Sequence, residues 1–146
     1  VTSMSTKTTS NTFDPYEYDT SSVTLVKFAS GALGKTAAIV DCFQPYYFHT
    51  HLVGSEGSLL DDRFTSMKLS KERNAWHRLS MKMCDSGDVS DHPYQSQFQE
   101  FFNALDRDED MPLTSFADAA RTFEVIFAAD QSAASGGQPV VPRSLT

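Results

Sequence analysis

Cysteine, positive charge and long apolar runs are all scarce in this chain of 146 residues. Its two cysteines, Cys42 and Cys84, are too few for a disulfide framework, and we expect free thiols in a reducing, cytoplasmic compartment. A disulfide between them would need a proximity that the sequence does not establish. No apolar run reaches the length of a membrane span, and the polar stretch Thr2–Ser10 lacks a signal-peptide core. We therefore expect no membrane partner.

The balance of charge limits the partners further. Twelve basic residues against 19 acidic ones give a net charge of −7, so no basic surface is available for a phosphate backbone. Nucleic acid is therefore not an expected partner. Hydrophobic residues make up 40% of the chain and eleven are Phe, which is typical of a globular protein and predicts one domain over residues 1–146.

The first half of the chain carries strand patterns, with β-branched content and short apolar alternation. We predict strands at 23–28, 32–43, 46–53, 58–60, 64–69 and 76–83. The first few residues are interpreted as the tail of a further strand, and Val140–Val141 as a short edge strand. Ser30-Gly31 predicts a hairpin turn, because glycine takes a positive φ at little cost.

The second half switches to helical spacing. Five apolar residues predict a helix over 94–105: Tyr94, Phe98, Phe101, Phe102 and Leu105. A second helix is predicted to begin near Ser115, with Asp118 three residues later, and to end at Gly136-Gly137. Its apolar stripe is Phe116, Ala119, Ala120, Phe123, Ile126 and Phe127. Strands followed by helices predict an α+β fold, with a largely antiparallel mixed sheet and both helices on one face.

The strands are apolar on both sides. Val23 and Leu25 point one way, whereas Val26 and Phe28 point the other. Two helices can cover only one face of the sheet. An uncovered apolar face of several hundred Å² forgoes on the order of 10 kcal/mol at roughly 25 cal/mol per Å². We therefore predict an open-faced sheet whose second face packs against another chain.

Five stretches resemble, in their order and spacing, the C-terminal domain of the Gfo/Idh/MocA oxidoreductases, the glucose–fructose oxidoreductase and inositol dehydrogenase family. They are residues 19–34, 53–59, 94–105, 112–123 and 132–140. The resemblance implies an open-faced sheet that lines a substrate cleft and forms homodimers or tetramers. It also implies that a Rossmann domain of the parent enzyme is missing from the chain. The implied parent is an NAD(P)-dependent oxidoreductase acting on a sugar, a polyol or a similar small hydroxy compound.

Several features of that family are absent here. The chain has no G-x-G-x-x-G fingerprint, and Gly31-Ala-Leu-Gly34-Lys35 is better explained as a hairpin turn. The Glu-Lys-Pro catalytic segment of the family and its catalytic His are also missing. We therefore assign no catalytic, cofactor or metal residue, and we expect the fragment alone to be inactive.

The family places polar and aromatic side chains of the strand before the Gly-x-x-Gly turn in its substrate cleft. By this resemblance the candidate substrate-binding residues are Gln44, Tyr46 and His49. A tyrosine offers a flat apolar wall and a hydroxyl, which suits sugar or polyol ligands. The alternative is ordinary packing of these side chains on a sheet face.

Other interpretations compete with this one. His49 and His51 with Glu56 are similar in spacing to a metal motif of the cupins, but the flanking glycines and the second motif are missing. The acidic stretch 85–92 suggests calcium but lacks the closing Glu of an EF-hand. A free-standing binding or oligomerisation module of the same fold, without enzyme activity, is the main alternative function.

Overall fold

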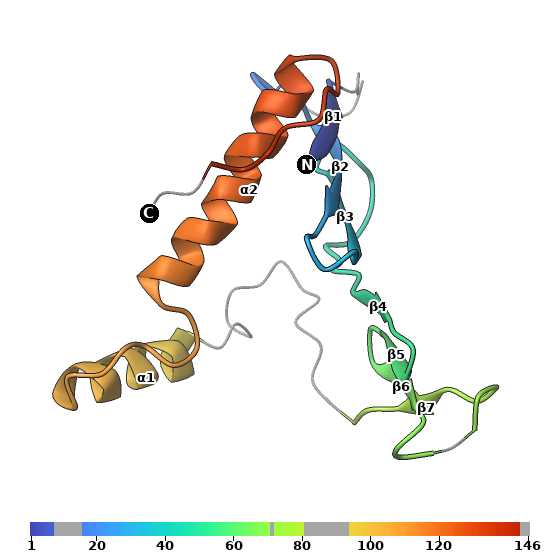
Figure 1. Ribbon diagram of the computed structural model, residues 1–146, viewed down its shortest axis with the longest axis vertical. Helices are drawn as coiled ribbons and strands as arrows, with labels where there is room; N and C mark the ends of the chain where they lie inside the picture. Colours follow the sequence, from blue (N-terminus) through green and yellow to red (C-terminus); the bar gives the residue numbers. More distant parts are fainter. Residues whose placement is uncertain (8–15, 71, 81–93, 144–146) are drawn as a thin grey trace. The chain divides into compact units, whose positions relative to one another are not determined.

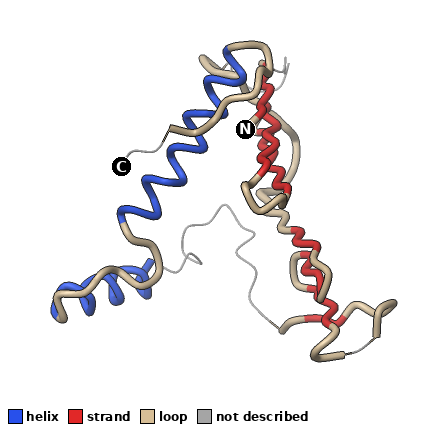
Figure 2. The backbone as a smooth tube through the Cα atoms, in the orientation of Figure 1, coloured by secondary structure: helices blue, strands red, loops and turns tan. Residues whose placement is uncertain are grey.

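The computed structural model describes residues 1–7, 16–70, 72–80 and 94–143, and the chain divides into two compact units. Unit 1 comprises Val1–Phe43 and Tyr94–Thr146, and unit 2 comprises Gln44–Pro93. Each unit has its own antiparallel sheet (Figures 1 and 2). The predicted α+β class is thus confirmed, although the described strands form two sheets where the sequence pattern predicted one. None of the described helices combines the length and the apolar character that a membrane span requires.

Unit 1 contains three strands in the order β1-β2-β3 and two helices. The elements are β1 (Thr2–Thr6), β2 (Ser21–Lys27), β3 (Leu33–Ile39), α1 (Tyr94–Asp106) and α2 (Phe116–Ala134). The predicted turn between β2 and β3 is confirmed. Gly31 has a φ of 88°, and its N–H donates to the carbonyl of Phe28 at 3.0 Å.

The two faces of this sheet differ in burial. Ser3 and Thr24 lie opposite each other on one face and are buried, with 2.9 Å between their hydroxyl oxygens. The opposite face carries large apolar side chains that are exposed. We call this set the apolar sheet face: Met4, Val23, Leu25, Leu33 and Ile39.

Both predicted boundaries of α2 are confirmed. The Ser115 hydroxyl accepts a hydrogen bond from the Asp118 N–H at 3.2 Å, which satisfies one of the free donors of the first turn. At the other end, Gly136 and Gly137 have φ values of 71° and 84°. The Gly137 N–H donates to the Ser132 carbonyl at 2.8 Å, closing the last turn as glycine-ended helices do.

α2 contacts β1 through small residues rather than through its predicted apolar stripe. Ala128 and Ser132 are buried, whereas Phe123, Ile126 and Phe127 are exposed. The Ser132 hydroxyl accepts from the Ser3 N–H at 2.9 Å and donates to the Gln138 carbonyl at 2.7 Å. These short bonds require the helix to approach the strand closely, which only small side chains permit.

Beside this contact, the C-terminal segment joins the edge of β1. The N-terminal amine of Val1 donates to the Val140 carbonyl at 2.8 Å, and the Val140 N–H donates to the Val1 carbonyl at 2.8 Å. The predicted edge strand near Val140 is therefore a single paired position.

The apolar face predicted for α1 is also exposed. Its residues Tyr94, Phe98, Phe101, Phe102 and Leu105 all remain accessible, and only Ala104 of this helix is buried. Of the two helices, α2 makes the extensive contact with a strand. The prediction that both helices cover one sheet face is thus wrong for α1 among the described residues.

Unit 2 contains four short strands in the order β4-β5-β6-β7. They are β4 (His51–Val53), β5 (Gly57–Leu60), β6 (Arg63–Ser66) and β7 (His77–Arg78). The long strand predicted over 46–53 is limited to β4, since Pro45 supplies no N–H at its start and residues 46–50 join no ladder. The end of the strand predicted over 76–83 lies outside the described residues.

Replacing Ser132 by Ala tests the contact between α2 and β1. The change leaves the buried Ser3 N–H and the Gln138 carbonyl without their partner, so we expect the free energy of unfolding to fall by about 1–3 kcal/mol. Chemical denaturation measures the loss. The matched control is Ser135→Ala, because the exposed Ser135 hydroxyl bonds only to carbonyls of its own helix. Equal stabilities of the two variants would contradict the role of Ser132.

Candidate functional site

Three polar side chains of unit 2 meet at one point. The Tyr47 hydroxyl donates to Asp61 Oδ2 at 3.0 Å, and His49 Nδ1 lies 3.2 Å from each carboxylate oxygen of Asp61. The same His49 nitrogen lies 3.2 Å from the Tyr47 hydroxyl. We call this group the Tyr47–His49–Asp61 cluster. Its members come from the segment before β4 and from the turn between β5 and β6.

The backbone around Asp61 brings the cluster together. Asp61 occupies the first position of the turn between β5 and β6, with a φ of 52°. Its N–H donates to the Thr50 carbonyl at 2.9 Å, and its carboxylate accepts from the Thr50 N–H at 2.9 Å. The Asp61 carboxylate therefore accepts the Thr50 N–H in the place that a backbone carbonyl would take if β4 began one residue earlier. This bond holds the segment before β4 next to the turn between β5 and β6.

Alternation along this segment decides which aromatic rings meet. Tyr47 and His49 stack with centroids 6.1 Å apart, and the rings of His49 and His51 are 6.2 Å apart. Tyr46 instead contacts Phe48 edge-on, at 5.0 Å between centroids. Residues two apart in an extended chain share a side. The segment thus carries a polar series and an apolar aromatic pair.

The electrostatics of the cluster favour an ionised Asp61. Its pKa is lowered chiefly by the hydrogen bond from the Thr50 N–H, and the Tyr47 hydroxyl and His49 lower it further, while partial burial opposes them. The pKa of Tyr47 is raised, mainly because its hydroxyl donates to the Asp61 carboxylate. At neutral pH, Tyr47 is thus a donor and Asp61 an acceptor.

This arrangement sets the tautomer of His49. A neutral imidazole places its proton on the nitrogen that faces a carboxylate, which here is Nδ1. Nε2 then carries a lone pair and accepts a hydrogen bond or a proton. With His49 half exposed, the cluster can bind a hydroxyl group that donates a hydrogen bond to Nε2.

The structure separates the three residues predicted from the sequence. His49 belongs to the cluster, Tyr46 pairs with Phe48, and Gln44 is exposed. No contact among the described residues joins His49 to either of the other two. Sequence reasoning missed both Tyr47 and Asp61 as members of a site. The two-residue spacing of Tyr47 and His49 indicates that their side chains share a side of an extended segment. The sequence does not indicate that the hairpin of β5 and β6 brings Asp61 to the same side.

The residues of the alternative metal motif have other partners. His49 bonds to Asp61, and the Glu56 carboxylate lies 3.3 Å from Lys68 Nζ. Within the described ranges, no three His, Cys, Asp or Glu side chains come together in a way that could hold a metal ion. The acidic stretch 85–92 and Cys84 lie outside the described residues, and Cys42 is a free, exposed thiol.

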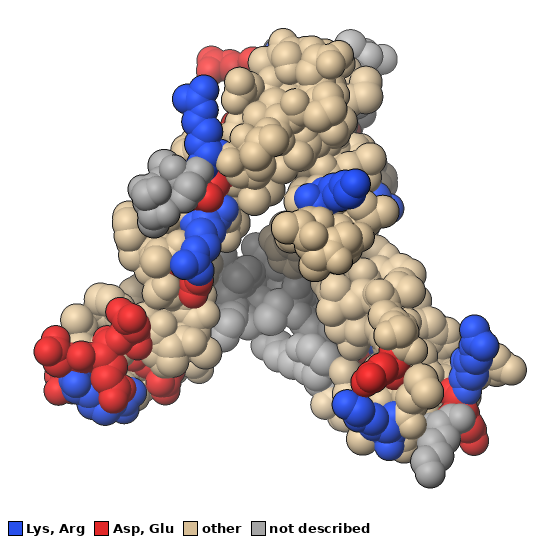
Figure 3. Space-filling model, viewed as in Figure 1, with Lys and Arg blue, Asp and Glu red and all other residues tan. Residues whose placement is uncertain are grey.

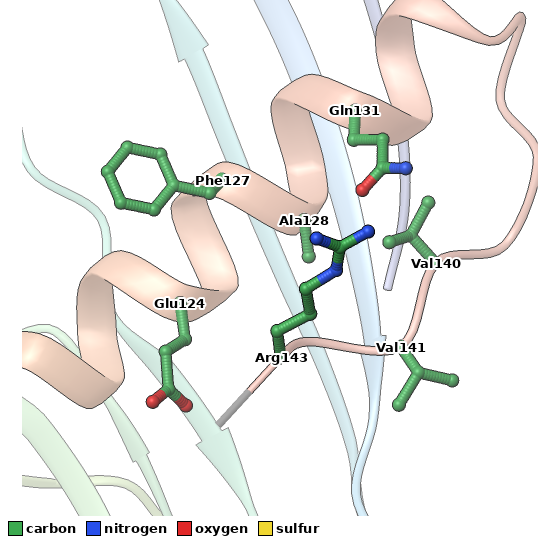
Figure 4. A pocket seen from close by; sticks show the side chains of 7 residues that line it. All are labelled: Glu124, Phe127, Ala128, Gln131, Val140, Val141 and Arg143. Carbon is green, nitrogen blue, oxygen red and sulfur yellow. The ribbon is translucent and has the colours of Figure 1, made fainter. Parts of the chain in front are cut away.

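Unit 1 has a cavity of about 420 Å³ between α2 and the C-terminal segment (Figure 4). Phe127 and Ala128 line it from the helix, and Val140 and Val141 line it from the segment. Figure 4 shows Arg143 reaching back from the segment toward the helix. The lining holds no histidine, cysteine or hydroxyl nucleophile, so this cavity offers binding and no evident chemistry.

Comparison of the chain with protein-family models, with curated proteins and with solved structures finds no match. The features of the chain that bear on function are therefore the Tyr47–His49–Asp61 cluster and the exposed surfaces of the two units.

Titration of Asp61 tests the electrostatics of the cluster. A carboxyl whose pKa is lowered by folding stabilises the protein above its unfolded pKa, and this stability is lost as the pH falls through the lower, folded pKa. We expect the free energy of unfolding to decrease as the pH falls from the ordinary Asp value of 3.8. Asp61→Asn should remove this part of the pH dependence.

The control for this titration is Asp62→Asn, because the Asp62 carboxylate lies 3.7 Å from Arg63 and 3.0 Å from Arg78 and takes no part in the bonds of the cluster. Denaturation between about pH 2 and 6 brackets the ordinary Asp range and measures both variants. A pH dependence that survives Asp61→Asn unchanged would contradict the assigned hydrogen bonds.

Proposed function

We propose that this chain is the C-terminal substrate-binding and oligomerisation domain of an NAD(P)-dependent oxidoreductase acting on a sugar, a polyol or a similar small hydroxy compound. The observation that carries the proposal is the apolar sheet face of unit 1. Large apolar side chains on a regular sheet are stable in water only when something covers them. A domain that works inside a larger assembly has such a cover, whereas an isolated one does not.

The chemistry of the apolar sheet face supports a second copy of the chain as that cover. Leu33 is 80% exposed and Met4 is 69% exposed, so little of the unit itself shields them. The charged residues that the register places on this face are Lys27 and Lys35, whereas acidic side chains gather around the end of α1 in Figure 3. Two such faces can pack together if the lysine methylene groups lie on the apolar neighbours and the amines stay in water at the rim.

The Tyr47–His49–Asp61 cluster supports the substrate part of the proposal. Its hydroxyl donor, its carboxylate acceptor and the free His49 nitrogen match the donors and acceptors of a polyol. The Tyr46–Phe48 pair lies on the other side of the extended segment and offers a separate flat apolar surface there. In this proposal the chain binds and orients the substrate at the cluster, and Gln44 and Tyr46 lie outside that surface.

Hydride transfer would need a nicotinamide cofactor, which accepts or supplies the hydride. The sequence holds no glycine-rich fingerprint for its pyrophosphate. Residues outside these 146 would then hold the nucleotide. The second candidate, a free-standing binding and oligomerisation module, uses the same two surfaces without hydride chemistry.

Leu33→Lys tests the apolar sheet face. The change should shift the protein from dimer or larger oligomer to monomer, because it removes the apolar Leu33 side chain and adds a positive charge directly opposite Lys27 on the same face. Sedimentation at micromolar concentration measures the change. Thr36→Lys is the matched control, since Thr36 is also exposed on β3 but points to the opposite face. A monomeric parent protein, or equal effects of both variants, would contradict this interface.

His49→Gln tests the substrate surface. We expect millimolar sorbitol to shift the NMR signals of the Thr50 and Asp61 amides in the parent protein, and the variant to weaken this binding about tenfold, the loss expected for one strong hydrogen bond. The control is His51→Gln, which changes a neighbouring ring that lies outside the bonds to Asp61. Unshifted signals in the parent, or equal losses in the two variants, would contradict a polyol site at the cluster.

A further inference from the structure

Unit 2 contains a second concave site that the proposed function does not use. A cavity of about 730 Å³ lies between the Gly54–Gly57 turn and residues 72–76. Its lining includes the side-chain-bearing residues Glu56, Glu72, Arg73, Asn74 and Trp76. No member of the Tyr47–His49–Asp61 cluster contributes to it. Its volume falls within the range of roughly 300–1,000 Å³ that is typical of small-ligand sites.

Hydrogen bonds across the cavity fix its two rims. Gly54 N–H donates to the Gly57 carbonyl at 2.9 Å, and Met67 N–H donates to the Glu56 carbonyl at 2.9 Å. The Thr65 hydroxyl donates to the Glu72 carbonyl at 3.2 Å and so ties the second rim to β6.

The floor of the cavity depends on a glycine. A Cβ on Gly57 would lie 2.5 Å from the Thr65 carbonyl oxygen, so only glycine allows these two strands to pair this closely. The cavity is thus formed by the fold of β5 and β6 and by their connections.

The charges around the cavity are balanced. Glu56 has the amine of Lys68 3.3 Å from its carboxylate, and Glu72 is followed directly by Arg73. Lys68 lies beside the lining rather than in it, so the cavity wall holds two acids and one base, and one of the acids is paired with Lys68. This wall has no surplus of positive charge that would attract an anion. The charges therefore favour a neutral ligand that uses these groups as hydrogen-bond partners.

The remaining lining indicates the shape of that ligand. Trp76 is 48% exposed and offers the largest flat apolar surface of any side chain. Asn74 both donates and accepts, the carboxylates accept, and Arg73 donates. A flat apolar wall surrounded by mixed donors and acceptors matches the apolar face and the hydroxyl rim of a sugar ring.

We propose that this cavity binds a neutral pyranose ring, with Trp76 as the stacking surface and Glu56, Glu72, Arg73 and Asn74 as partners of its hydroxyl groups. The site is separate from the Tyr47–His49–Asp61 cluster and does not rest on the proposed oxidoreductase function. It would equally suit a binding module.

The chain has one tryptophan, so its fluorescence reports on this cavity directly. We expect methyl α-D-glucopyranoside to change the Trp76 emission in a saturable way at millimolar concentration. Sorbitol, which has similar hydroxyl groups but no ring, should give no saturable change. Glucose 6-phosphate should bind no more tightly than the neutral glucoside, because the rim has no excess of positive charge. A linear change with all three, or saturation with sorbitol alone, would overturn the proposal.

Paired variants locate the binding. Arg73→Gln and Asn74→Ala should each weaken binding of the glucoside about five- to tenfold, the loss expected for one hydrogen bond. Arg78→Gln is the control, because Arg78 belongs to unit 2 but bonds to Asp62 outside the cavity. Circular dichroism should show the same folded content for all three.

His49→Gln separates this proposal from the proposed function. It should leave the Trp76 titration unchanged while weakening the sorbitol binding that shifts the amides at the cluster. If His49→Gln removes the Trp76 response and Arg73→Gln does not, the ring lies at the cluster and the cavity proposal is wrong. If the Trp76 response persists but the cluster shows no polyol binding, the substrate part of the proposed function fails instead.

Discussion

The hydroxyl of Ser132 is the contact on which unit 1 depends. It bonds to the backbone of Ser3, 129 positions earlier in the sequence, and to Gln138, so one side chain joins α2, β1 and the C-terminal segment. Because the contact needs a short distance, small residues fill it and the large apolar residues of α2 are left outside. The exposure of Phe123 and Phe127 follows from this geometry. The apolar sheet face stays exposed among the residues that the structure describes.

Asp61 has a comparable structural role in unit 2, where one side chain joins several segments. Its carboxylate takes the N–H of Thr50, and the same oxygens receive the Tyr47 hydroxyl and face the His49 ring. One ionised group thus ends the ladder at β4 and gathers the polar side chains of the site. The hydrogen bond from the Thr50 N–H holds the backbone in place and is also the main cause of the lowered Asp61 pKa. A change to this bond therefore alters both the local structure and the charge of the site.

Local signals predicted the local structure well. The turn at Gly31, the cap at Ser115 and the end of α2 at Gly136 all obey rules that act within four or five residues, and all are present. Contacts between residues far apart in the sequence could not be predicted in this way. Helical spacing identified the apolar stripe of α2, yet a hydrogen bond to Ser3 decided which side of the helix is buried. Likewise, Asp61-Asp62 is a sequence typical of a hairpin turn with positive φ, but nothing local indicates that the Asp61 carboxylate reaches His49, twelve residues earlier.

Charge placement bears on how the apolar sheet face can be covered. The register places Lys27 and Lys35 on this face, opposite Leu33 and Leu25. Long lysine side chains can pack their methylene groups on apolar neighbours and keep the amine at the rim in water. Four acidic residues lie close together in sequence elsewhere in unit 1, over Asp106–Asp110 at the end of α1 and just after it. A partner that buries this face would therefore remove mainly apolar side chains from water and few carboxylates. Association by the hydrophobic effect is favourable under this condition.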